Sequence, residues 1–185
     1  MKKFLILLLL FCIIPAYADI YTHKEILDEI EKNGPSVQGY FELGKAYLYE
    51  KDYLRAINAF DYTLNYETDD PEIYNYLGIC YYRRRNFNKA LENFKKAVSL
   101  NNENLIYINN LALCYKSLGD RENYEKTIGK IAAYIPKTQE DYVQITQILY
   151  DRKDYERARA ILMQGMKKYP DNPILNKLFT VLNKL

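Results

Sequence analysis

Few residues of this 185-residue chain have side chains suited to acid–base or metal chemistry. The sequence contains one histidine, His23, and three cysteines, and it has no glycine-rich phosphate loop. A nucleophile needs a base beside it, and no Ser-His or Cys-His pairing can be identified. We therefore interpret His23 as a solvated residue without a catalytic partner. We predict that the chain is not an enzyme and that it uses no cofactor and no metal.

A run of three arginines, Arg83–Arg85, is the next candidate for chemistry, because clustered guanidinium groups bind phosphate or carboxylate. The run falls at the end of an expected helix, where the helix dipole stabilises cations. We favour a solvated helix end over a dedicated anion site. The formal net charge of +2 equals the charge of Lys2 and Lys3, so the rest of the chain is neutral. Neutrality gives no electrostatic reason to expect nucleic acid or anionic lipid as a partner.

The stretch from Asp70 to Asn104 predicts two helices joined as a hairpin. Asp70 is a good N-cap residue, and Pro71 stands at the first helical position, where its missing N–H is not needed. Apolar and small residues recur every three or four positions, which is the spacing of one helix face. On the first helix they are Tyr74, Leu77, Gly78 and Tyr81, and on the second they are Ala90, Phe94 and Ala97.

The same pattern recurs with a period of 34 residues and no insertion. One hairpin cannot bury its apolar face alone, so repeated hairpins stack on one another. An N-cap former precedes each unit and the closing helix, and these residues are Ser36, Asp70, Asn104, Thr138 and Asn172. The predicted organisation is a signal peptide (1–18), an N-terminal helix (19–36), four units (37–70, 71–104, 105–138, 139–172) and a C-terminal capping helix (173–185). The alternative for the last segment is an exposed docking helix.

The repeat resembles the tetratricopeptide repeat, in which an aromatic residue, Leu-Gly, Tyr, Ala, Phe, Ala and Pro recur at set positions. Residues 71–104 match this pattern almost throughout, and the resemblance covers residues 37–172. It implies an all-α fold, a right-handed α-solenoid of helix-turn-helix hairpins. The last two units diverge, since Tyr124 replaces an alanine and Thr146 a glycine, and Gly129 weakens its helix. We therefore expect the local packing of the third unit to differ.

The resemblance also implies a partner, a protein or peptide bound in a concave groove lined by the first helices. Phe41, Tyr82 and Tyr150 lie outside the expected core positions, which favours a binding surface; contact with neighbouring helices is the alternative. The clamp of basic residues that holds a peptide carboxylate in some relatives is absent. The residues expected in the groove are Phe41, Lys45, Leu48, Tyr49, Asn75, Ile79, Tyr82, Arg83, Asn109, Leu113, Lys116, Val143, Gln147 and Tyr150.

The first eighteen residues are typical of a secretory signal. Lys2 and Lys3 form the positive start, an apolar run follows, and Ala16-Tyr17-Ala18 is a cleavage site. We expect cleavage after Ala18, export to the periplasm or the medium, and no membrane span afterwards. The alternatives are a lipoprotein anchored at Cys12 and an uncleaved anchor. The apolar stretch is shorter than the roughly 20 residues that a bilayer requires.

An exported protein can contain disulfides, and Cys80 and Cys114 lie one repeat apart, on neighbouring first helices. Packed helices are about 8–10 Å apart, whereas a disulfide needs Cα atoms within about 7 Å. We therefore interpret both cysteines as small buried thiols.

Charge is distributed unevenly along the chain. Residues 19–70 contain five lysines or arginines against twelve acidic residues, so the remainder of the chain is basic. The predicted function is a scaffold or adaptor of the cell envelope that binds a protein or peptide. The alternative is a structural subunit that associates with itself, head to tail, through its acidic and basic parts.

Overall fold

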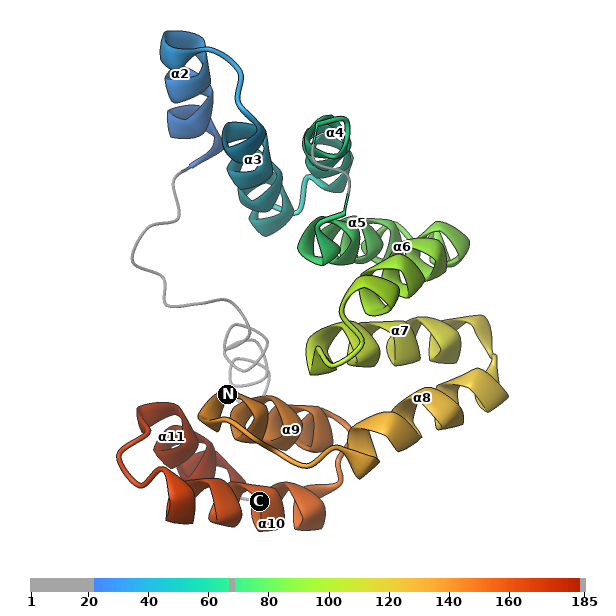
Figure 1. Cartoon of the computed structure of the whole chain (residues 1–185), viewed down its shortest axis with the longest axis vertical. Helices are drawn as coiled ribbons and strands as arrows, with labels where there is room; N and C mark the ends of the chain where they lie inside the picture. Colours follow the sequence, from blue (N-terminus) through green and yellow to red (C-terminus); the bar gives the residue numbers. More distant parts are fainter. Residues whose placement is uncertain (1–21, 67–68, 184–185) are drawn as a thin grey trace. The chain divides into compact units, whose positions relative to one another are not determined.

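The computed structural model describes residues 22–66 and 69–183, and the predicted signal peptide lies outside them. The described residues form ten helices and no strand, so the predicted all-α fold is confirmed (Figure 1). The chain divides into two compact units, Met1–Leu100 and Asn101–Leu185. Within the described residues, no helix has both the length and the apolar composition needed to span a bilayer.

From residue 22 onward, the described part of the first unit contains a single helix followed by two helical hairpins. Helix α2 packs on α3, α3 pairs with α4, α4 packs on α5, and α5 pairs with α6. Each hairpin therefore stacks on the next, as the repeat pattern predicts. The bounds are α2 His23–Asn33, α3 Val37–Tyr49, α4 Tyr53–Leu64, α5 Pro71–Arg83 and α6 Phe87–Leu100.

The second unit contains two hairpins and a closing helix. Helix α7 pairs with α8, α9 pairs with α10, and α7 also contacts α9. Helix α11 packs on α10 and α9, and it buries Leu175, Leu178 and Leu182. The Arg159 guanidinium donates a hydrogen bond of 2.9 Å to the carbonyl of Leu182. Helix α11 is thus a packed cap. The bounds are α7 Leu105–Leu118, α8 Arg121–Ala133, α9 Gln139–Asp151, α10 Tyr155–Lys168 and α11 Pro173–Leu182.

The helices begin where side-chain caps satisfy their first backbone N–H groups. All five predicted N-caps are confirmed, and each side chain accepts a hydrogen bond from the first turn of its helix. Thr22 and Glu25 form a reciprocal capping box at α2. Each such cap contributes about 1 kcal/mol, so the sequence specifies these helix starts locally.

The four hairpins share one turn geometry. In each turn, one residue adopts a left-handed backbone conformation, and the side chain of the next residue accepts a hydrogen bond from the first turn of the second helix. The left-handed residues are Lys51 (φ 65°), Arg85 (φ 62°), Gly119 (φ 75°) and Lys153 (φ 64°). Glycine adopts this conformation readily, whereas the other three side chains are strained by it.

Close approach of paired helices explains the small residues in the repeat. A Cβ atom on Gly44 would lie 2.5 Å from the Phe60 ring, and one on Gly78 would lie 2.5 Å from the Phe94 ring. Ala90, on the helix facing Gly78, has no exposed surface. Small residues therefore let large rings fill the space between the helices, which gives close packing without voids.

The third hairpin packs differently, as expected. Helix α8 buries only Thr127 and Ile131. Tyr124 is half-buried, whereas the alanines at its position in the other hairpins have no exposed surface. A Cβ atom on Gly129 would meet no atom within 4 Å. The loop that follows exposes 80% of Ile135. Helix α8 is therefore held by few buried side chains.

Cys80 and Cys114 are buried and are not joined by a disulfide, which confirms their interpretation as buried thiols. Burial raises the pKa of Cys80 to about 12 and that of Cys114 to about 11. His23 is partly exposed, in keeping with a solvated residue, but it has a carboxylate neighbour that the sequence did not indicate. Its Nδ1 atom is 2.7 Å from Oε1 of Glu50, and its ring stacks on Tyr47 with centroids 5.2 Å apart. The partner comes from the end of α3, 27 residues away, so local sequence could not reveal it.

Candidate protein-interaction surface

In the first unit, the predicted groove residues lie on α3 and α5. Tyr49 and Arg83 are exposed at the ends of these helices, and 46% of the Tyr49 surface is accessible. Lys45 pairs with Glu42 at 2.9 Å. The other members are less accessible. Leu48, Ile79 and Tyr82 are half-buried, and Asn75 is buried.

Phe41 belongs to an aromatic cluster inside the first unit. Its ring centroid lies 6.1 Å from Phe60 and 6.0 Å from Tyr76, and Phe60 stacks on Tyr76 at 5.4 Å. The Lys45 ammonium also lies 5.2 Å from the Phe41 ring. Contacts with neighbouring helices therefore account for the aromatic side chain at this position.

Tyr82 and Tyr150 also have aromatic neighbours within their own hairpins. Tyr82, on α5, meets Phe87 at the start of α6 with centroids 5.3 Å apart and the rings at 61°. Tyr150, on α9, meets Tyr155 at the start of α10 at 5.6 Å and 62°. Phe41, Tyr82 and Tyr150 therefore make the contacts with neighbouring helices that were the alternative to a binding surface. Their place on a partner surface stays a prediction.

In the second unit, the predicted residues lie on α7 and α9. Leu113 is 40% exposed and Lys116 is exposed, while Asn109 and Tyr150 are half-buried. Val143 and Gln147 are buried, at 7% and 4% exposed. The Gln147 amide donates a 3.0 Å hydrogen bond to Asp151. Desolvation raises the pKa of the Asp151 carboxyl, and this hydrogen bond opposes the increase.

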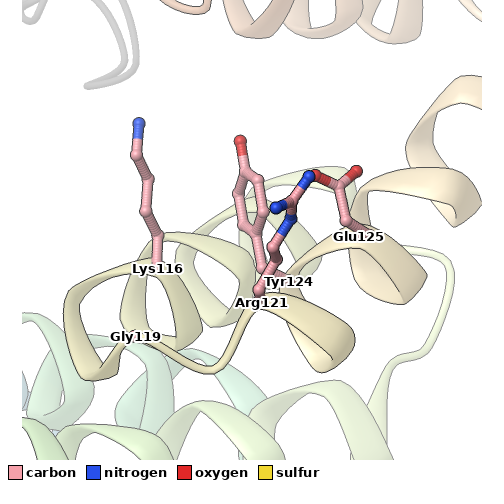
Figure 2. Close-up of a pocket in the computed structure, with 5 residues that line it drawn as sticks. All are labelled: Lys116, Gly119, Arg121, Tyr124 and Glu125. Atoms are coloured by element: carbon pink, nitrogen blue, oxygen red, sulfur yellow. The ribbon is translucent and has the colours of Figure 1, made fainter.

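A pocket of about 330 Å³ lies at the turn between α7 and α8. Figure 2 shows Lys116, Arg121, Tyr124 and Glu125 extending to the same side of this hairpin. Gly119, the left-handed turn residue, completes the lining. The Lys116 ammonium lies 6.0 Å from the Tyr124 ring centroid. The Arg152 guanidinium, which follows α9, lies 5.6 Å from the same centroid.

Sequence reasoning identified only one residue of this pocket, Lys116, as a site residue. Arg121, Gly119 and Glu125 were missed, and Tyr124 was noted only as a departure from the repeat. The period of 34 contains a signal for the pocket, because Lys116 and Arg121 occupy the positions that hold a pair of apolar or aromatic residues in every other hairpin. Those pairs are Leu48 with Tyr53, Tyr82 with Phe87, and Tyr150 with Tyr155.

Metal chemistry has no obvious site in the part of the chain that the structure describes. There, no three residues among His, Cys, Asp and Glu are grouped in a way that could hold a metal ion. The features available for binding are therefore exposed aromatic, apolar and cationic side chains.

Comparison with known proteins identifies the repeat. Residues 71–104, the α5–α6 hairpin, match the family model of the tetratricopeptide repeat. Comparison with curated protein sequences finds no match. Among solved structures, a thermophilic tetratricopeptide-repeat protein of Thermus thermophilus, TTC0263, aligns with a TM-score of 0.65 at 15% identity, covering 88% of this chain and 89% of that one.

Two further structures have similar folds. MamA aligns with a TM-score of 0.58 at 18% identity, over 80% of this chain and 86% of that one. YrrB, described as a tetratricopeptide-repeat protein with an unusual peptide-binding site, gives 0.55 at 15% identity, over 85% and 81%. These levels of identity show the fold alone. The chain thus contains a tetratricopeptide repeat at residues 71–104, within an all-α helical repeat fold shared with proteins of that kind.

Proposed function

We propose that this chain is a non-enzymatic scaffold that binds a protein or peptide partner through the first helices of its hairpins. The observation that supports the proposal is the exposure of large side chains on these helices, Tyr49 on α3 and Leu113 on α7. Arg83 and Lys116 place positive charge on the first helices of the same two units. Large apolar and aromatic side chains beside cations are typical of the residues that supply binding energy at protein interfaces.

The fold supports the same proposal. Tetratricopeptide-repeat proteins generally mediate protein–protein contacts, and one structural neighbour is described as having a peptide-binding site. In this chain the rings of Phe41, Tyr82 and Tyr150 contact other rings of the fold. The residues that we assign to direct contact with the partner are therefore the more exposed ones, Tyr49 and Leu113.

A photo-crosslinking experiment tests this assignment. The photoreactive residue p-benzoylphenylalanine would replace Tyr49 or Leu113 in the full chain, expressed in its own cell. Matched controls carry it at Leu54 on α4 and Met163 on α10, which are second helices with 54% and 61% exposure. We expect a defined partner, identified by mass spectrometry, from the first-helix positions only. Equal capture from both sets, or capture from the second helices alone, would contradict the proposal.

We also propose that the partner is met outside the cytoplasm, in the cell envelope or the medium. The pattern of residues 1–18, with a positive start, an apolar run and an Ala-Tyr-Ala cleavage site, supports export. Mass spectrometry of the extracytoplasmic protein should find Asp19 as the first residue. A chain in that fraction that still begins at Met1, or a chain found only in the cytoplasm, would refute this part.

A further inference from the structure

Two cations line the pocket at the α7–α8 turn, and a third, Arg152, contacts the Tyr124 ring of its lining. Lys116 and Arg152 both lie within about 6 Å of the Tyr124 ring centroid, and Arg121 lines the same pocket. A cation near an aromatic face is attracted by the ring, so Tyr124 interacts favourably with both cations. Glu125 contributes one negative charge to the lining. Asp120, the capping residue at the same turn, contributes a second negative charge, so these five groups together carry a net charge of +1.

Within the described residues, Lys116, Arg121 and Arg152 form no ion pair, so no carboxylate neutralises their charges at close range. Lys45 and Lys96, by comparison, pair with Glu42 and Asp69. In two other hairpins, an arginine three residues after the capping aspartate pairs with that aspartate. The equivalent residue in the third hairpin is Asn123, which donates to Asp120 from its backbone and its side chain.

The position of the cations also distinguishes this hairpin from the others. Apolar or aromatic pairs close the ends of the other three hairpins, and two of these pairs make ring contacts at 5.3 and 5.6 Å. Lys116 and Arg121 cannot make that contact, and the end of the α7–α8 hairpin is open as a pocket instead (Figure 2). The third hairpin thus exchanges packing at its end for an accessible cationic site.

We propose that this pocket binds a carboxylate-rich peptide segment, which deepens the proposed function and rests on it. The Arg121 and Arg152 guanidinium groups provide forked donors that match carboxylates, and Lys116 adds a point charge. Tyr124 supplies a flat surface for the peptide. A volume of about 330 Å³ suits one acidic side chain and its neighbour rather than a large cofactor.

A carboxylate fits this pocket better than a phosphate group. Phosphate sites usually recruit the free N–H groups at a helix N-terminus. At the start of α8 the Asp120 side chain already accepts the backbone N–H of Asn123, and its negative charge opposes a second anion there. Glu125 opposes a doubly charged group more strongly than a single carboxylate. Single charges spread along a peptide avoid both conflicts.

The test is a fluorescence anisotropy titration of the full chain with fluorescein-labelled hexaglutamate at low salt. Exposed ion pairs contribute modestly, so replacing Lys116, Arg121 or Arg152 with Gln should each weaken binding about two- to fivefold. Glu125→Gln should strengthen it by a similar factor. The matched control is Lys130→Gln, which removes one charge from an exposed position of α8 outside the pocket and should change affinity less than twofold.

Several results would overturn the proposal. These are the absence of hexaglutamate binding, equal binding of labelled hexaglutamine, a loss in Lys130→Gln as large as in the pocket variants, and no gain in Glu125→Gln. Displacement by inorganic phosphate at lower concentration than by free hexaglutamate would assign the site to phosphate instead. Circular dichroism of each variant must show unchanged helix content. The Glu125→Gln variant should bind more tightly, a result that a folding defect cannot produce.

We assign the acidic segment to the partner protein of the proposed function, on the charge complementarity of the pocket. A second copy of this chain, whose helix α2 exposes Asp28, Glu29 and Glu31, is the other outcome of the test. Sedimentation of the chain alone separates these sources. If the chain is a dimer, and if free hexaglutamate or the triple variant Asp28→Asn, Glu29→Gln, Glu31→Gln abolishes the dimer, the carboxylates come from a second copy. If the chain is a monomer, they come from another protein. Crosslinking from Tyr49, which lies on α3 in the first unit, does not depend on the pocket, so failure of hexaglutamate binding would leave the proposed function standing.

Discussion

A methyl group added at Gly78 should destabilise the first unit, because the space it would enter is already filled. The added Cβ atom would lie 2.5 Å from two carbons of the Phe94 ring. Phe94 is 2% exposed, so its ring has little room to move away. Relief of the clash therefore requires α5 and α6 to separate or the ring to leave its preferred rotamer.

The size of the effect follows from two opposing contributions. Overfilling a packed core typically costs about 1–3 kcal/mol. Replacing glycine with alanine inside a helix recovers about 0.5–1 kcal/mol, because alanine loses less backbone entropy on folding. The net expectation for Gly78→Ala is a decrease of about 1 kcal/mol in the free energy of unfolding.

Gly129→Ala is the matched control, since it makes the same chemical change in a helix without the steric conflict. A Cβ atom there has no neighbour within 4 Å. Only the helix-propensity contribution remains, so this variant should be more stable by about 0.5–1 kcal/mol. The two substitutions should therefore have opposite signs.

Urea unfolding followed by circular dichroism measures both changes, and hydrogen exchange with mass spectrometry locates them. We expect faster exchange in α5 and α6 for Gly78→Ala and slower exchange in α8 for Gly129→Ala. Phe94→Leu tests the cause, because a smaller side chain should make Gly78→Ala less costly in the double variant than in the wild-type background. A neutral or stabilising Gly78→Ala would refute the requirement for close approach, and simple additivity would exclude the Phe94 ring as the obstacle.

Three further outcomes can be checked by the same unfolding measurements. Thr146 Oγ1 is buried without a hydrogen-bond partner in the part of the chain that the structure describes, so Thr146→Val should stabilise by about 1 kcal/mol; a destabilisation would mean that the hydroxyl has a partner. Lys153→Gly should stabilise the protein by about 0.5–1 kcal/mol, because glycine adopts the left-handed turn conformation without strain. Gly119→Ala should destabilise it by about 1 kcal/mol for the same reason. Changes in stability of the same sign and size in the two variants would exclude backbone strain as the cause. Burial raises the pKa of Cys80 to about 12 and that of Cys114 to about 11, above the ordinary 9.0, so these thiols ionise at lower pH in the unfolded chain than in the folded one. The stability that they contribute is therefore fully present below pH 9 and should be lost between pH 9 and about 12. Rapid reaction of the native thiols with a disulfide reagent at about pH 8 would contradict this burial.

Most of the fold could be predicted because its signals are local. The N-caps, the hairpin turns and the three- to four-residue spacing of apolar side chains act within one helix or one turn. The period of 34 then showed that these local units repeat. The looser third hairpin was also predictable, since Tyr124 and Gly129 break the pattern at known positions.

The candidate sites were less predictable because accessibility depends on neighbours from other helices. Repeat positions alone did not distinguish Tyr49, which is exposed, from Gln147, which is buried. The pocket of the third hairpin required the observation that the Tyr124 ring is close to both Lys116 and Arg152, residues from different hairpins.

The sequence by itself therefore determined the helix starts, the shared turns, the repeat length and the small residues that allow paired helices to approach. Only the tertiary structure decided which side chains these helices cover. It placed Phe41 among the rings of Phe60 and Tyr76 and joined His23 to Glu50. The physical reason is range: caps and turns are satisfied within a few residues, whereas burial and side-chain pairing depend on distances between helices that are remote in sequence.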